Sequence, residues 1–293
     1  MKAFVFPGQG SQFPGMGYDL YKSNEKVKSL FNEADDILGF TLSNVMFNGS
    51  EEELKQTKIT QPAIFLHSIA ELIVLQETYS PGAVAGHSLG EFSSLVANNT
   101  ISFEDGLKLV FLRAKAMQKS CENSNGTMAA ILGLDDKIIK ETCESFDGNV
   151  TAANFNCPGQ VVISGELNAV KTICEKFNDI GARRSILLPV GGAFHSNLMN
   201  DAKSELKEAI HKTKFNNPTC PIYQNFTAQK TTSIDIIKQN LINQLTAPVL
   251  WTQTINNMVN DGYLDYTEVG PGKVLQGLIR KINRETITQS ALS

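Results

Sequence analysis

The order of hydrophobic and polar positions along the chain predicts strands that alternate with helices. Short apolar runs closed by turn residues, at 2–6 and 83–86, indicate buried strands. Longer and largely apolar segments at 62–79 and 88–97 indicate helices, the first with Pro62 in its opening turn. Further strands are expected at 221–226 and 264–269, and further helices at 102–118, 198–212, 235–245, 251–261 and 273–283. This alternation is typical of an α/β fold with a mostly parallel sheet.

A different pattern occupies the middle of the chain. Here the expected order is strand, helix, strand, strand, helix, strand, at 127–134, 135–146, 150–156, 160–165, 166–180 and 183–190. This βαββαβ order is that of a ferredoxin-like unit. We therefore expect a small domain at 125–191, inserted into a larger domain formed by 1–124 and 192–293.

Composition excludes several classes of protein. Of the 293 residues, 42% are hydrophobic and 19% charged, which is enough apolar material for a core and argues against disorder. A net charge of −4 argues against a nucleic-acid-binding protein. The five cysteines include no CxxC pair, so neither a disulfide framework nor a metal site is expected. With no signal peptide and no apolar run of membrane-spanning length, we expect a cytoplasmic protein without a membrane segment.

The strongest local signal for chemistry is Gly86-His87-Ser88-Leu89-Gly90. It matches G-x-S-x-G, with a predicted strand before it and a predicted helix after it, which is the context of a nucleophile elbow. The pattern makes Ser88 the candidate nucleophile. The alternative is an ordinary turn between a strand and a helix.

A serine nucleophile needs a base, and the chain has four histidines. The side chain of His87 should diverge from that of its neighbour Ser88. His67 lies in a buried helix, and His211 lies near the end of a surface helix. By elimination the candidate base is His195, in a glycine-flanked loop, although a structural loop histidine remains open.

Two further features could complete such a site. The backbone N–H of Leu89 and that of Gln9, in a turn after the first strand, could stabilise an oxyanion, although the second could equally be a plain turn. On the helix expected at 102–118, Arg113 lies between Leu109 and Met117 on the apolar side. An arginine on a buried helix face indicates a site for an anionic group.

Six segments in the order of the chain resemble the malonyl-CoA:acyl carrier protein transacylase family. They are PGQGSQ at 7–12, GHSLGE at 86–91, FLRAKAM at 111–117, NFNCPGQVVISG at 154–165, GAFHS at 192–196 and EVGPGKVLQGL at 268–278. The resemblance covers essentially the whole chain. It implies an α/β-hydrolase-like domain that carries a ferredoxin-like insert.

The resemblance also implies roles for the residues at matching positions. Ser88 would take the malonyl group as an ester, with His195 as general base and then acid. Backbone amides of Gln9 and Leu89 would hold the oxyanion. Arg113 would pair with the malonyl carboxylate.

Further positions follow from the same resemblance. Met117 would line the acyl pocket, and Asn156 would contact the substrate. Phe194 resembles the pattern of malonyl-selecting relatives, although it could equally be a core residue that anchors the loop. The family uses a Ser-His dyad, in which the histidine donates to a backbone carbonyl, and that carbonyl is assigned here to Leu250 in APVLW.

The implied activity is transfer of malonyl from malonyl-CoA to the phosphopantetheine thiol of acyl carrier protein, in support of fatty acid synthesis. No cofactor is expected, since the coenzyme A thioester is itself a substrate, and a monomer is expected. A serine hydrolase or thioesterase, and an inactive module that binds carrier protein, are the alternatives. Basic side chains that could meet an acidic carrier protein, or be merely solvated, are Lys171, Lys176, Arg183 and Arg184.

Overall fold

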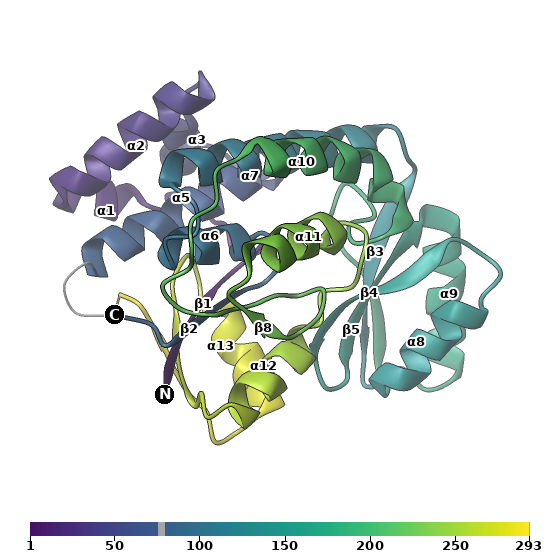
Figure 1. The fold of residues 1–293 in the computed structure, drawn as a ribbon. Helices are drawn as coiled ribbons and strands as arrows, with labels where there is room; N and C mark the ends of the chain where they lie inside the picture. The colour runs from purple at the N-terminus through teal and green to yellow at the C-terminus, as the bar shows by residue number, and fades with distance from the viewer. Residues whose placement is uncertain (76–79, 293) are drawn as a thin grey trace.

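The computed structural model describes residues 1–75 and 80–292 and contains two β-sheets (Figure 1). The larger sheet has the strand order β10-β9-β1-β2-β7-β8. Its strands are β1 (Lys2–Phe6), β2 (Ala83–Gly86), β7 (Ile222–Tyr223), β8 (Lys230–Thr231), β9 (Asp265–Glu268) and β10 (Ile287–Ser290). All neighbouring strands in it are parallel except β7 and β8. The predicted α/β class with a mostly parallel sheet is confirmed.

Helices cover both faces of this sheet. On one face lie α2 (Glu25–Leu38), α5 (Thr57–Leu75), α6 (Gly90–Ala97), α7 (Phe103–Glu122), α10 (Asn200–Lys212) and α11 (Ile234–Gln244). On the other face lie α12 (Trp251–Asn260) and α13 (Val274–Ile282). The short helices are α1 (Tyr18–Ser23), α3 (Leu42–Asn48), α4 (Glu51–Lys55) and the 3-10 turn η1 (Asn197–Met199).

The alternation of side chains along β1 explains this layering. Phe4 and Phe6 belong to the core shared with α2, α5 and α7, whereas Ala3 and Val5 belong to the core shared with α12 and α13. Because successive side chains of a strand point to opposite faces, a strand whose residues are nearly all apolar must be covered on both sides. The parallel register of β1 with β2 runs to Phe6 opposite Gly86, so the segments that follow both strands leave the sheet at one edge.

Helix α5 corrects one prediction. It begins at Thr57, so Pro62 lies inside the helix and not in its opening turn. The residues before Pro62 include the buried Thr57, Thr60 and Gln61, and this packing holds the helix although proline has no N–H to donate. The end expected at 76–79 lies outside the described residues. By length and composition α5 could also span a membrane, but 67% of its apolar window is buried inside the protein.

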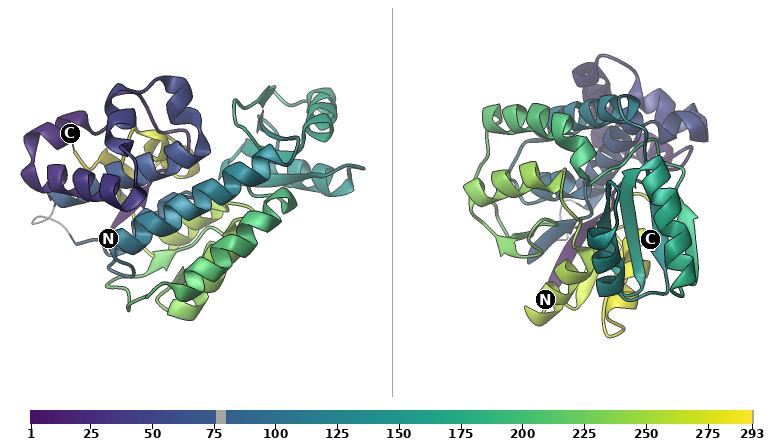
Figure 2. Two further views of the ribbon diagram at one scale, coloured as in Figure 1. Left: turned by 90° about the horizontal axis from the view of Figure 1, so that it is seen from above. Right: turned by 90° about the vertical axis from the view of Figure 1, so that its right-hand side faces the viewer.

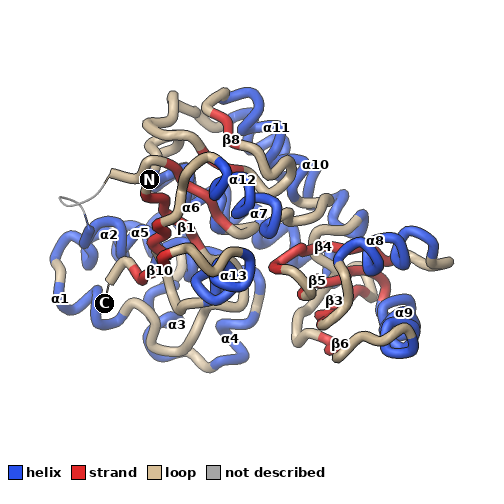
Figure 3. The backbone as a smooth tube through the Cα atoms, turned by 90° about the horizontal axis from the view of Figure 1, so that it is seen from below, coloured by secondary structure: helices blue, strands red, loops and turns tan. Residues whose placement is uncertain are grey.

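The middle of the chain forms a separate antiparallel sheet with the order β4-β5-β3-β6 (Figure 3). Its elements follow the predicted order: β3 (Gly126–Leu132), α8 (Asp136–Ser145), β4 (Val150–Cys157), β5 (Gln160–Glu166), α9 (Leu167–Asp179) and β6 (Arg184–Leu187). The last strand is shorter than the predicted 183–190, because its pairing with β3 ends at Leu187 opposite Ala129.

Two features join the small sheet to the rest of the protein. Helix α7 runs from the large sheet to the start of β3 (Figure 2). Strand β4 makes a parallel bridge with the segment before α12, in which Phe155 N–H donates to Val249 O at 2.9 Å and Val249 N–H donates to Ala153 O at 2.8 Å. The face of the small sheet that carries Asn154 and Asn156 is thereby held close to the end of β2.

Candidate active site

Ser88 lies in a tight turn between β2 and α6. Its backbone φ is +53°, in the left-handed region that residues other than glycine rarely adopt. The flanking glycines make this turn possible, because a Cβ added to Gly86 would lie 1.9 Å from the Gly90 carbonyl carbon. A Cβ added to Gly90 would lie 2.1 Å from Phe6 O. The sequence G-x-S-x-G therefore folds here into the tight geometry of a nucleophile elbow.

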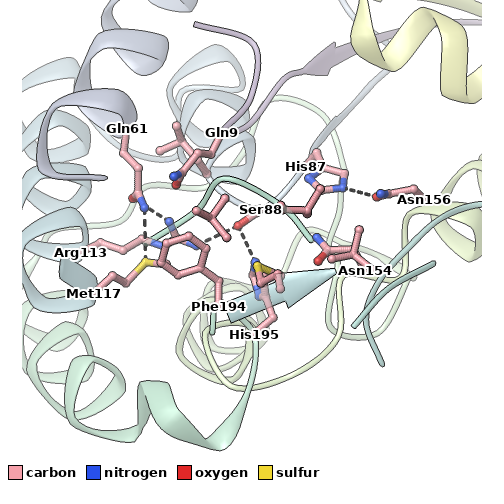
Figure 4. A pocket seen from close by; sticks show the side chains of 15 residues that line it. Gln9, Gln61, His87, Ser88, Arg113, Met117, Asn154, Asn156, Phe194 and His195 are labelled. Carbon is pink, nitrogen blue, oxygen red and sulfur yellow. Dashed lines mark hydrogen bonds between the residues drawn. The ribbon is translucent and has the colours of Figure 1, made fainter. Parts of the chain in front are cut away.

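His195 reaches this serine from the loop before η1. Its Nε2 lies 2.8 Å from Ser88 Oγ (Figure 4). Its Nδ1 lies 2.9 Å from the Gln244 carbonyl oxygen. A carbonyl only accepts, so Nδ1 carries the proton and Nε2 is free to accept one from the serine hydroxyl. Burial, and then the nearby Arg113 charge, lower the pKa of His195 to about 3. The imidazole is therefore neutral at physiological pH, as a general base must be.

The predicted role of Leu250 is wrong. The Leu250 carbonyl accepts the backbone N–H and the hydroxyl of Thr254, both at 2.8 Å, in the first turn of α12. Gln244 is the last residue of α11, where carbonyl groups have no partner within the helix. The Gln244 carbonyl accepts only a long bond from the Ala247 N–H, at 3.3 Å, besides the 2.9 Å bond from His195, so it is the acceptor that the histidine uses.

Arg113 is 1% exposed and projects from α7 beside the serine. Its guanidinium donates to Gln61 Oε1 at 2.7 Å, to Ser88 Oγ at 2.9 Å and to Gln244 Oε1 at 3.2 Å. Burial lowers the pKa of Arg113 to about 10, partly offset by the charge of Glu91, so the group stays cationic at neutral pH. Among the described residues no carboxylate forms an ion pair with it. A buried cation held only by neutral acceptors is suited to an anionic ligand.

These groups open into one cavity of about 180 Å³. It is lined by Gln9, Gln61, His87, Ser88, Leu89, Arg113, Met117, Met128, Asn154, Asn156, Val162, Leu188, Val190, Phe194 and His195. Every site residue expected from the sequence is in this lining except Leu250. Met117, Val162 and Phe194 contribute apolar surface to the cavity, and its volume suits a small acyl group.

The loop after β1 packs directly on the elbow. A Cβ added to Gly8 would lie 2.4 Å from His87 O, so only glycine permits this approach. The loop thereby brings Gln9 to the cavity beside Leu89. Within residues 1–75 and 80–292, the backbone N–H groups of Gln9 and Leu89 have no hydrogen-bond acceptor. Two free donors beside Ser88 are suited to a developing oxyanion.

The other histidines lie as expected in part. The His87 side chain turns away from Ser88, and its Nε2 donates to Asn156 Oδ1 at 2.9 Å. Asn156 thus fixes a residue of the elbow and also lines the cavity. His67 is buried on α5, as expected, 3.7 Å from Glu71, and its Nδ1 has no hydrogen-bond partner among the described residues.

Sequence reasoning missed two glutamines of the site. Gln61 accepts from Arg113, and its Nε2 lies 3.3 Å from Met117 Sδ. Gln244 accepts from Arg113 and donates to Ser88 O at 3.0 Å. Gln61 carries the same signal that singled out Arg113, a polar residue in an apolar helix, whereas Gln244 lies at a helix end with no motif around it.

The arrangement can perform covalent catalysis at an acyl carbon. It joins a strained serine, a neutral histidine within hydrogen-bond distance, two free N–H donors and a buried cation. In the part of the chain that the structure describes, no three His, Cys, Asp or Glu side chains are grouped so as to hold a metal ion.

Comparison with known proteins points to the same chemistry. Residues 3–292 match the family model of the acyl transferase domain. Malonyl CoA-acyl carrier protein transacylase of Bacillus subtilis (strain 168) is 43% identical over 290 residues, which are 98% of this chain and 92% of that protein. The protein of that name from Staphylococcus aureus (strain MRSA252) is 40% identical over 286 residues, 97% of this chain and 92% of its own length.

Solved structures agree with the sequence comparison. The acyl-carrier-protein-S-malonyltransferase from Bartonella henselae superposes with a TM-score of 0.96 at 38% identity, covering 100% of this chain and 95% of that one. A malonyl-transacylase solved in complex with a type II PKS acyl-carrier protein superposes with a TM-score of 0.95 at 38% identity, covering 99% of this chain and 95% of that one.

Proposed function

The chain belongs to the acyl transferase family, and we propose that it transfers malonyl from malonyl-CoA to the phosphopantetheine thiol of acyl carrier protein. One observation carries the choice of acyl group. The Arg113 guanidinium lies 2.9 Å from the Ser88 hydroxyl in a cavity that is otherwise largely apolar. A cation in that place favours an acyl group that ends in a carboxylate, which malonyl has and acetyl lacks.

The first half-reaction forms an ester on Ser88. Its Oγ attacks the thioester carbonyl carbon, and the hydroxyl proton passes to Nε2 of His195. The Nδ1–H of His195 stays hydrogen-bonded to the Gln244 carbonyl oxygen. The N–H groups of Gln9 and Leu89 stabilise the oxyanion. When the C–S bond breaks, the coenzyme A thiolate takes the proton from the imidazolium, and the malonyl-serine ester remains.

The second half-reaction reverses these steps with a different thiol. His195 takes the proton of the phosphopantetheine thiol, the sulfur attacks the ester, and Ser88 Oγ leaves with the proton. Each half-reaction exchanges a thioester and an ester, so the cycle needs no cofactor besides the coenzyme A substrate. Hydrolysis would need water as the acceptor in place of the thiol.

The finer architecture is part of the same proposal. We assign residues 1–124 and 192–293 to an α/β-hydrolase-like catalytic domain and 125–191 to a ferredoxin-like domain. The antiparallel order β4-β5-β3-β6, with α8 and α9 over one core, supports the second assignment. We further propose a cytoplasmic monomer that meets malonyl-CoA and acyl carrier protein and supplies fatty acid synthesis.

Labelling of the enzyme tests the mechanism. Incubation with malonyl-CoA alone should leave one malonyl group on Ser88, and Ser88→Ala should abolish it, as measured by intact-protein and peptide mass spectrometry. Addition of acyl carrier protein should discharge the label onto the carrier. Release of free malonate in its place would indicate a thioesterase, and a label on another residue would rule out Ser88 as nucleophile.

A further inference from the structure

Asn225 lies directly behind the nucleophile. The parallel pairing of β2 with β7 sets Val84 opposite Ile222 and Ala85 opposite Tyr223, so the residues after the two strands lie side by side. The Asn225 side chain is 0% exposed and is absent from the lining of the cavity. It therefore acts on the serine from the protein side and not from the substrate side.

The amide of Asn225 holds both ends of the strained turn. Its Oδ1 accepts the Ser88 backbone N–H at 2.6 Å, and its Nδ2 donates to Gly86 O at 2.7 Å. A single planar amide thus fixes the peptide groups on either side of His87. Because Ser88 has a φ of +53°, which a serine adopts only when its surroundings impose it, these two bonds supply a restraint that the turn lacks by itself.

A buried carboxylate in turn orients Asn225. Glu91, in the first turn of α6, is 0% exposed, and its Oε1 accepts the Asn225 backbone N–H. Its Oε2 accepts from Gln224 Nε2 at 3.4 Å. Glu91 lies three residues after Ser88, in the helix that follows the elbow, so the hydrogen bonds that join Glu91 to Asn225 and Asn225 to Ser88 close a loop around the turn.

We propose that Asn225 is a positioning residue, which holds the Ser88 elbow in its reactive conformation through a two-sided hydrogen bond. The inference rests on the proposed function, in which Ser88 is the nucleophile. It predicts that loss of the amide lowers the rate of ester formation and leaves substrate binding unchanged. Small displacements of a reacting group cost about 10²-fold in rate, so we expect a 10- to 100-fold loss.

Rapid-quench measurement of malonyl-enzyme formation tests this, with the rate expressed per active site that finally takes label. In Asn225→Ala this rate should fall while the malonyl-CoA concentration at half-maximal rate stays at the wild-type value. Asn98→Ala is the matched control. Asn98 is also 0% exposed, and its amide donates to Cys220 O at 3.1 Å and accepts from Thr100 Oγ1 at 2.6 Å, away from the elbow. It should lose stability but acylate at the wild-type rate per labelled site.

Asn225→Asp gives a second test that does not depend on the alanine variant folding. An ionised carboxylate can accept from Ser88 N–H but cannot donate to Gly86 O, whereas a protonated carboxyl group can do both. Relative to wild type, the acylation rate of this variant should therefore recover as pH falls from about 8 to about 5.5, since burial raises the pKa of a carboxyl group. Burial also raises the pKa of the neighbouring Glu91 to about 7, and because both proteins contain Glu91 the rates are compared with wild type at each pH.

The outcomes separate the two proposals. If the wild-type enzyme is labelled on Ser88 but Asn225→Ala acylates at the wild-type rate, the positioning role alone is overturned. The same holds if Asn225→Asp shows no recovery relative to wild type at low pH. If the wild-type enzyme is labelled on another residue, both proposals are overturned.

Discussion

Replacement of Arg113 tests the basis of acyl selectivity most directly. In the free enzyme the guanidinium donates to Gln61, Gln244 and Ser88 Oγ, all neutral groups. A malonyl carboxylate would add charge-assisted bonds that acetyl cannot make. We therefore expect Arg113→Ala to lower kcat/KM for malonyl-CoA steeply, while kcat/KM for acetyl-CoA holds or rises.

The magnitude follows from the bonds at stake. Two hydrogen bonds to a charged group contribute about 1.5–3 kcal/mol each, and redirecting the N–H that now contacts Ser88 Oγ costs about 1.5 kcal/mol, which leaves roughly 1.5–4.5 kcal/mol. Because Arg113 is 1% exposed, solvent screens these bonds little and the upper half of that range applies. At about 1.4 kcal/mol per factor of ten, the wild-type preference for malonyl over acetyl should be about 10²–10³-fold.

The assay compares kcat/KM for malonyl-CoA and acetyl-CoA, with acyl carrier protein as acceptor, in wild type and variants. Arg113→Lys should rescue only partly, since an ammonium group cannot make the paired contact. Lys115→Ala, which removes an exposed cation from the same helix, should change neither substrate. If Arg113→Ala lowers both substrates by one factor while the protein remains folded, the guanidinium is structural and the reasoning is refuted.

Three further predictions concern the base, its burial and the carrier protein. His195→Ala should slow acylation by about 10²–10⁴-fold in rapid-quench kinetics, whereas His211→Ala should not. Equal losses in the two variants would refute the choice of His195 as the base. Burial lowers the pKa of His195 to about 3, so between about pH 3 and pH 6.5 this imidazole is protonated in the unfolded chain but not in the folded one. From pH 7 to pH 5, urea unfolding should therefore show wild type losing about 2 kcal/mol more stability than His195→Asn, and an equal loss would contradict the assigned burial. Charge reversal at the exposed Arg183 and Arg184 should raise KM for acyl carrier protein but not for malonyl-CoA, most at low salt, and equal effects would exclude a docking role.

Ser88 and Arg113 each had a local signal in the sequence, whereas Met117, Asn156 and Phe194 followed only from the family resemblance. Ser88 lay in a motif, and Arg113 was a charge on an apolar helix face. Asn225 and Gln244 had no such signal, because Asn225 lies just after β7 and Gln244 is the last residue of α11. Asn225 is 137 positions from Ser88 along the chain, and Gln244 is 156 positions from it. Positions at which distant segments meet follow from packing and not from spacing along the chain. The assignment of the histidine acceptor to Leu250 rested on the family resemblance, and the structure has Gln244 in that role.

The elements of the fold also differ in whether the sequence contained a hydrophobic pattern that predicts them. Strands β1 and β2 were predictable because they are apolar on both faces. Strand β10, with the sequence ITQS, is a polar edge strand paired only with β9, so it has no apolar pattern to detect. Helix α2 does have a pattern, since Val27, Leu30, Phe31 and Ala34 share one buried face, but no helix was assigned there. The hydrophobic pattern of α2 was therefore present in the sequence, and this helix could have been predicted.

The contact between Ser88 and Gln244 also has a consequence for synthesis of the protein. The two residues are 156 positions apart, so at about 5–20 residues per second the nucleophile leaves the ribosome roughly 8–30 s before the residue that holds both its carbonyl and the histidine. Strand β1 must wait longer still for β9, its other neighbour in the sheet. A nascent chain therefore carries the serine without a working base. The proposed attack on coenzyme A thioesters therefore has to wait until Gln244 has been made.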